Sequence, residues 1–122
     1  MSASKRVLII DDSLVSRMMI KKGIEDLCPD WSLLEAKDAE NALQVVKDNE
    51  FDCFSIDYNM PGMDGLELMG ILNQQFPGAK KALLTANIQD AIRDKTLSLG
   101  GQCINKPISE ATIEQLVSYF ND

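Results

Sequence analysis

The stretch Val7-Leu8-Ile9-Ile10-Asp11-Asp12 is a continuous apolar run that ends in two adjacent carboxylates. An apolar run without polar alternation is typical of a strand that is buried on both faces, as in the centre of a parallel sheet. The run is also far too short to cross a bilayer. These residues therefore predict a central strand with acidic side chains at its carboxyl end.

Short apolar runs alternate with helical patterns along the rest of the chain. The further runs cover residues 33–34, 51–56, 82–85 and 103–104. Apolar spacing at i, i+3, i+4 and i+7 predicts helices over residues 20–27, 39–46, 68–72 and 113–120, and a weaker pattern predicts one over 88–99. The expected N-caps are Ser13, Asp38 and Ser109, and the expected helix ends are followed by Pro29, Gly78 and Gly100.

Five repeats of strand and helix indicate an α/β protein with a parallel sheet and helices on both faces, because each crossover is right-handed. The first and third strands are the most continuously apolar and are expected at the centre of the sheet. The second and fifth strands are shorter and more polar and are expected at its edges. Ligands of such sheets bind beyond the carboxyl ends of the strands, so the residues that end each strand are the first candidates for a site.

Composition restricts the function further. The chain has 122 residues, of which 45% are hydrophobic and 25% charged, as expected of one globular domain. Twelve basic residues against 19 acidic ones give a net charge of −7. This charge argues against binding to nucleic acid or to an anionic membrane. The first residues do not resemble a signal peptide, so the expected location is the cytoplasm.

Histidine does not occur in the sequence. Histidine-based general-base catalysis within this chain is therefore excluded, and a histidine that takes part in its chemistry must come from a partner. The cysteines Cys28, Cys53 and Cys103 lack the paired spacing of a zinc site or a disulfide framework.

Four of the five predicted strands deliver a polar group to the same edge of the sheet. The first ends in Asp11 and Asp12, the third in Asp57 and the fourth in Thr85, and the fifth leads into Lys106. Converging carboxylates repel one another, and Mg²⁺, which takes hard oxygen ligands, would relieve that repulsion. Since neighbouring side chains of a strand diverge, we expect Asp12 to contact the metal directly and Asp11 to act through water.

Asp57 stands alone at the end of its strand and is the expected nucleophile. The metal and Lys106 would neutralise charge on the oxygens of an incoming phosphoryl group. The hydroxyl of Thr85 would donate a hydrogen bond to one of those oxygens.

This ordered set resembles the receiver domain of two-component response regulators, especially the single-domain chemotaxis type. The separations from Asp12 to Asp57, from Asp57 to Thr85 and from Thr85 to Lys106 are 45, 28 and 21 residues, close to the family pattern. Residues 59–65 also resemble the family's loop after the phosphorylated strand. The resemblance extends over residues 6–120.

The resemblance implies a flavodoxin-like, doubly wound (βα)5 fold with strand order 2-1-3-4-5, forming a single receiver domain over residues 1–122. It implies a phosphorylation-controlled signalling switch that assists its own aspartyl phosphorylation and dephosphorylation, rather than an enzyme. The phosphoryl group would come from a phosphohistidine of a histidine kinase or histidine phosphotransfer domain. A downstream protein would bind an altered face, expected at the 88–99 helix, the fifth strand and the last helix.

The family roles carry over residue by residue. Asp57 would be the phospho-acceptor, Lys106 the partner of the phosphoryl group and Thr85 the switch hydroxyl. The implied ligands of Mg²⁺, with Mn²⁺ as a substitute, are Asp12, Asp57 and the backbone carbonyl of Asn59, with Asp11 acting through water.

The sequence departs from the family in two places. Receivers usually carry an aromatic residue three positions before the lysine, where this chain has Cys103, and the stretch 100–106 is one residue shorter than usual. Coupling to the last two helices therefore needs another route. The peptide between Lys106 and Pro107 is usually cis in the family.

Two alternatives remain open. One is a receiver-like module that binds partners without phosphorylation. The other is a metal-dependent phosphohydrolase with an aspartyl-phosphate, but haloacid-dehalogenase-type enzymes place a second aspartate two residues after the nucleophile, whereas Asp11 and Asp12 are adjacent. Nucleotide or flavin binding has little support, because residues 10–13 contain no glycine-rich phosphate loop.

Overall fold

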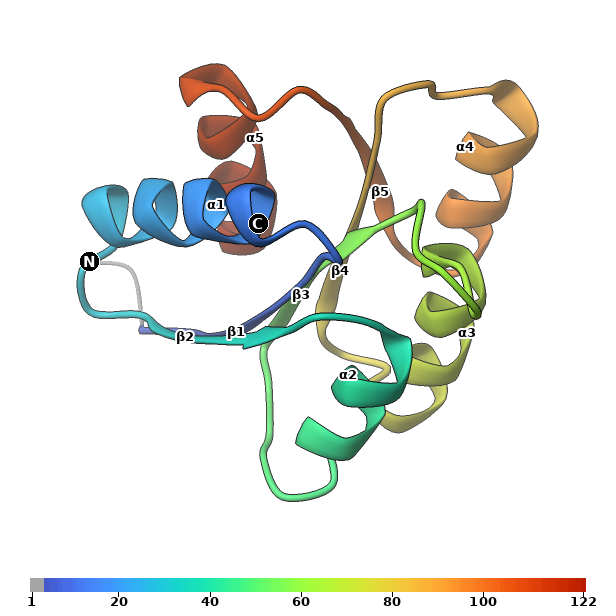
Figure 1. The fold of residues 1–122 in the computed structure, drawn as a ribbon, viewed down its shortest axis with the longest axis horizontal. Coiled ribbons are helices and arrows are strands. Elements are labelled where there is room, and N and C mark those ends of the chain that lie inside the picture. The colour runs from blue at the N-terminus through green and yellow to red at the C-terminus, as the bar shows by residue number, and fades with distance from the viewer. Residues whose placement is uncertain (1–3) are drawn as a thin grey trace.

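The computed structural model describes residues 4–122. Over that range the chain alternates strictly between strand and helix (Figure 1). The strands are β1 (Arg6–Ile10), β2 (Ser32–Ala36), β3 (Cys53–Asp57), β4 (Lys80–Thr85) and β5 (Gln102–Asn105). The helices are α1 (Leu14–Leu27), α2 (Ala39–Val45), α3 (Gly65–Gln75), α4 (Asp90–Ser98) and α5 (Glu110–Asn121).

The strands form one parallel sheet in the order β2-β1-β3-β4-β5. This order confirms the expected flavodoxin-like fold, with β1 and β3 inside the sheet and β2 and β5 at its edges. All five residues of β3 are buried, whereas residues of β2 and β5 are partly exposed. Burial on both faces favours apolar side chains, which explains the apolar runs of the central strands.

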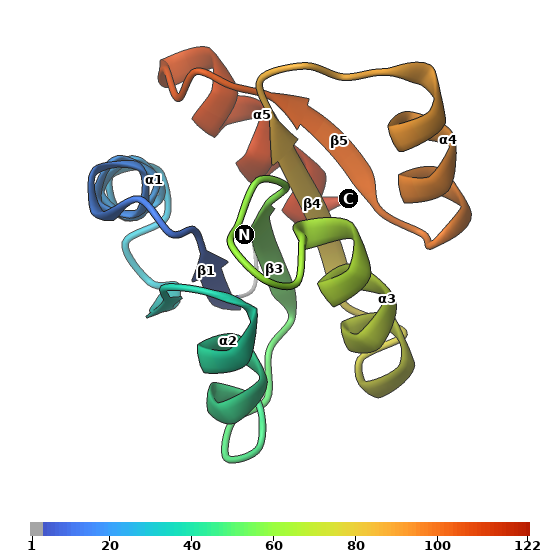
Figure 2. The ribbon, with the colours of Figure 1, turned by 45° about the vertical axis from the view of Figure 1, so that its right-hand side comes forward.

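Helices cover both faces of the sheet (Figure 2). On one face, α1 and α5 contribute Ile20, Ile24 and Leu116 to a core with β1 and β4. On the other face, α2 and α3 pack residues such as Ala42 and Leu68 against the same sheet. Within the described residues, no helix combines the length and apolar character needed to span a bilayer.

Side-chain caps set the starts of four helices. The expected N-caps Ser13, Asp38 and Ser109 each accept a backbone N–H from the first turn of their helix. Asp64 caps α3 in the same way and was not expected from the sequence. The fourth predicted helix is shorter than its pattern, because α4 begins at Asp90 and its N-cap Gln89 makes no side-chain capping bond.

A close approach between two backbones ties α3 to the end of β3. The N–H of Gly65, the first residue of α3, donates to the carbonyl of Tyr58 at 3.0 Å. A Cβ atom at Gly65 would overlap the carbonyl oxygen of Asp57. Only glycine lets the helix start this close to the strand, so Gly65 helps to fix the backbone that carries Asp57.

We therefore expect Gly65→Ala to destabilise the protein by about 2 kcal/mol or more, since the new methyl group must displace backbone rather than a flexible side chain. Gly70→Ala in the same helix is the matched control, because a Cβ there meets nothing within 4 Å. It should stabilise the protein by about 0.5–1 kcal/mol. Urea unfolding of the three proteins measures both changes, and equal effects of the two substitutions would contradict the packing argument.

Candidate functional site

The predicted site residues meet at the carboxyl edge of the sheet. Asp57 and Thr85 are the last residues of β3 and β4. Asp11 and Asp12 directly follow β1, and Lys106 directly follows β5. Since all the strands are parallel, their carboxyl ends lie along the same edge (Figure 2).

Three carboxylates converge at this edge. One oxygen each of Asp11, Asp12 and Asp57 lies within 4.8 Å of the others. Asp11 and Asp57 are only 1% and 5% exposed, whereas Asp12 is exposed to solvent. The adjacent aspartates reach the same place because β1 ends at Ile10, so neither follows the alternation of a strand.

Lys106 supplies a cation between two of these carboxylates. Its Nζ lies 3.2 Å from Oδ2 of Asp11 and 3.2 Å from Oδ1 of Asp57. Burial alone would lower the pKa of Lys106, but the two carboxylates outweigh burial and raise its pKa. The backbone N–H of Lys106 donates to the carbonyl of Thr85 at 3.0 Å, and the Lys106–Pro107 peptide is cis. The ammonium group is thus held charged and in place.

One ammonium does not balance three carboxylates. Burial, followed by the charge of Asp11, raises the pKa of Asp57 to about 6, although Lys106 acts in the opposite direction. The site therefore holds excess negative charge at neutral pH and offers carboxylate oxygens on three residues. That donor set fits a hard divalent cation such as Mg²⁺, which is held by few carboxylates and completes its shell with water or phosphate.

Asp11 is fixed on every side. Its Oδ1 accepts the N–H of Ser13 at 2.9 Å, and its backbone N–H donates to the carbonyl of Ala36 at 3.1 Å. Its own carbonyl accepts a hydrogen bond from Nη1 of Arg17 at 2.6 Å. The sequence patterns did not predict this contact of Arg17. The sequence shows only a basic residue in the helix that follows the acidic pair.

Thr85 and Asn59 have different surroundings. Thr85 is buried, and its Oγ1 accepts the N–H of Asn87 at 3.3 Å, which holds the hydroxyl in the turn after β4. Asn59 is exposed in the loop after β3. The roles of Thr85 as a switch and of the Asn59 carbonyl as a ligand stay predictions.

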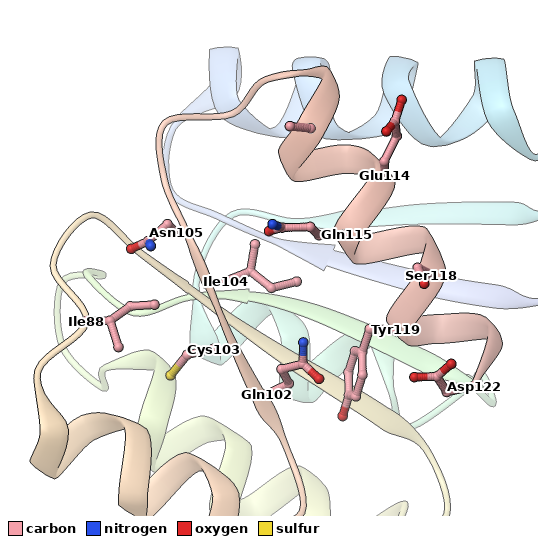
Figure 3. Close-up of a pocket in the computed structure, with 11 residues that line it drawn as sticks. Ile88, Gln102, Cys103, Ile104, Asn105, Glu114, Gln115, Ser118, Tyr119 and Asp122 are labelled. Carbon is pink, nitrogen blue, oxygen red and sulfur yellow. The ribbon is translucent and has the colours of Figure 1, made fainter.

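Cys103, three positions before Lys106, is partly buried in β5. Its Sγ lies 3.4 Å from Oγ1 of Thr96, which is fully buried in α4 and donates to the carbonyl of Ile92 at 2.7 Å. Beside it, a pocket of about 690 Å³ opens between β5 and α5, lined by Ile88, Cys103 and Gln115 among others (Figure 3). The thiol thus links β5 to α4 through a small polar contact.

Comparison with known proteins agrees with this geometry. The family model of the response regulator receiver domain matches residues 7–118. The sensor protein EvgS of Escherichia coli is 36% identical over 104 residues, which cover 84% of this chain but only 8% of EvgS. The chemotaxis protein CheY-3 of Vibrio cholerae is 27% identical over 121 residues, which cover 94% of this chain and 90% of CheY-3.

A solved structure shares the same fold. The CheX–CheY–BeF₃–Mg²⁺ complex from Borrelia burgdorferi contains a chain that superposes with a TM-score of 0.82 at 24% sequence identity. The match covers 92% of this chain and 85% of that chain.

The raised pKa of Asp57 predicts a pH-dependent stability in the absence of metal. The folded protein keeps a proton on Asp57 up to about pH 6, whereas the ordinary pKa is 3.8. The resulting stabilisation is fully present below the ordinary pKa and is lost as the pH rises through about 6. We therefore expect the free energy of unfolding of Asp57→Asn, relative to that of wild type, to rise by on the order of 2 kcal/mol between about pH 4 and about pH 7.5.

Urea unfolding in the presence of a chelator tests this difference across the pH range. Asp26→Asn is the control, because Asp26 is exposed on α1 and pairs with Lys22 at the surface. A stability difference between wild type and Asp57→Asn that stays constant with pH would contradict the prediction.

Proposed function

The chain belongs to the response regulator receiver family, and from this premise we propose that it is a phosphorylation-controlled switch of a two-component phosphorelay. In this proposal residues 1–122 act as a single receiver domain in the cytoplasm. The chain would assist the phosphorylation and dephosphorylation of its own Asp57, and its output would be altered binding to another protein rather than a small-molecule product.

The observation that carries the proposal is the position of Lys106. Its ammonium group lies 3.2 Å from Asp57 and from Asp11, beside a third carboxylate. A phosphoryl group that arrives at Asp57 brings negative oxygens into this site. Lys106 would bind one of them and so stabilise the charge of the transfer step.

In the transfer step, a carboxylate oxygen of Asp57 attacks the phosphorus of a phosphohistidine on the partner. The P–N bond breaks as the P–O bond forms, and the partner's imidazole retains the electron pair of the broken bond. Asp12, Asp57 and the carbonyl of Asn59 would hold Mg²⁺, with Asp11 acting through water. The bound metal would neutralise charge on the phosphoryl oxygens. The structural relative with BeF₃ and Mg²⁺ in its complex supports this choice of metal.

Because this chain has no histidine, a phosphohistidine donor would have to lie outside residues 1–122. We propose a histidine kinase or a histidine phosphotransfer domain. Leu14, Val15 and Met18 at the start of α1 are between 58% and 65% exposed next to the acidic pair. This apolar surface would receive the donor and bring its phosphohistidine to Asp57.

The alternatives predict different chemistry. A receiver-like module that acts without phosphorylation has no need for a buried Asp57 with a raised pKa beside an ammonium group. A phosphohydrolase would turn over many small phosphate esters, whereas the proposed switch would accumulate one phosphoryl group on Asp57 and release it only as that adduct hydrolyses. Intact mass and phosphate release separate the three possibilities.

Incubation with a small-molecule phosphodonor and Mg²⁺ should add one phosphoryl group to the protein. Intact-mass spectrometry should show no adduct with Asp57→Asn or with a chelator in place of Mg²⁺. Asp64→Asn is the matched control, since Asp64 lies in the loop after β3 and asparagine caps a helix as well as aspartate does. An adduct that persists in Asp57→Asn, or one that forms without metal, would refute the proposed acceptor chemistry.

Phosphorylation should alter the face formed by α4, β5 and α5. With beryllofluoride and Mg²⁺ as the phosphoryl mimic, amide hydrogen exchange should change at this face. Thr85→Ala should still form the phosphoryl adduct on Asp57 but should lose most of the exchange response, because the hydroxyl that couples the loop to the phosphoryl group is gone. Protection that changes only on α1 or α2 would place the output elsewhere.

A further inference from the structure

Arg17 joins three elements around the acidic pair. It lies at the end of the first turn of α1, and its side chain is only 14% exposed. Its Nε lies 3.1 Å from Oε1 of Glu35 in β2, while its Nη1 donates to the carbonyl of Asp11 at 2.6 Å. The fork of the guanidinium group thus bridges β2 and the end of β1, which a single ammonium group cannot reproduce.

The carbonyl that Arg17 binds belongs to the peptide between Asp11 and Asp12. The other side of Asp11 is fixed through its N–H, which donates to Ala36 of β2. With both ends of Asp11 held, the plane of the following peptide is fixed. That plane sets where the Cα atom of Asp12, and hence its carboxylate, emerges at the edge of the site.

We propose that Arg17, oriented by Glu35, is a positioning residue that fixes the Asp11–Asp12 peptide and so sets the affinity of the acidic cluster for Mg²⁺. The inference rests on the proposed function, since it assumes that this cluster is the metal site. Partners that orient metal ligands from outside the ligand shell change metal affinity by about 10–100-fold when they are removed.

Charge alone predicts the opposite effect. Arg17 is a cation near a site for a cation, so its neutralisation should strengthen Mg²⁺ binding by simple electrostatics. Loss of the fixed peptide should weaken binding instead. The direction in which Mg²⁺ affinity changes therefore separates positioning from electrostatics. A residue that served only the stability of the fold would leave the Mg²⁺ affinity of the folded protein unchanged.

Mg²⁺ dissociation constants should be measured by calorimetry on wild type, Arg17→Met, Arg17→Lys and Lys21→Met. Arg17→Lys keeps the charge but loses the fork, so it also serves if Arg17→Met fails to fold. Lys21→Met is the matched control. Lys21 lies on the same helix as Arg17, its Nζ is 3.6 Å from Oε2 of Glu35, and its replacement removes the same charge. A metal-free readout is the amide resonance of Asp12, recorded by NMR in the presence of chelator.

We expect both Arg17 variants to bind Mg²⁺ about tenfold more weakly and to shift the amide resonance of Asp12 without metal. Lys21→Met should bind as tightly as wild type or more tightly and should leave that resonance in place. Unchanged or tighter binding by the Arg17 variants would overturn the inference while the proposed function stands. Failure of wild type itself to bind Mg²⁺ would overturn the proposed function. It would also overturn the inference that Arg17 positions a metal site.

Discussion

The repulsion among three carboxylates at one edge of the sheet is the constraint on which the rest of the structure depends. Asp11, Asp12 and Asp57 have oxygens within 4.8 Å of one another, with one ammonium group between two of them. Charges of the same sign converge only if a rigid scaffold holds them. The fully buried β3, the close contact of Gly65 and the hydrogen bonds around Asp11 supply that rigidity. Because the scaffold holds these carboxylates together, the site favours added positive charge or a bound metal.

Much of this scaffold follows from short-range patterns in the sequence. The apolar runs predicted the strands and their central or edge positions, and Ser13, Asp38 and Ser109 predicted three helix starts. The edge to which Asp57 and Lys106 belong followed from the parallel order of the strands. Each of these inferences depends on a period or on a residue type with a strong local preference, and the structure confirms them.

What the sequence did not predict depends on pairing between distant segments. The contact of Arg17 with Glu35 joins residues 18 positions apart, on a helix and a strand whose relative placement no helical pattern specifies. Helix α4 begins at Asp90 without a side-chain cap. No capping residue in the sequence therefore marks its first residue. The contact of Cys103 with Thr96 joins β5 to α4, and it depends on how that helix packs against the strand.

The ion pair between Lys106 and Asp11 links residues 95 positions apart, and this separation has a consequence for synthesis on the ribosome. The acidic residues leave the ribosome well before their counter-ion, so an incomplete chain carries the repulsion of the site without its compensation. Long-range contacts of this kind also form late in folding, because a large loop must close first. Assembly of the acidic site with its lysine would then coincide with completion of the sheet, and a nascent or truncated chain without β5 would lack the proposed switch.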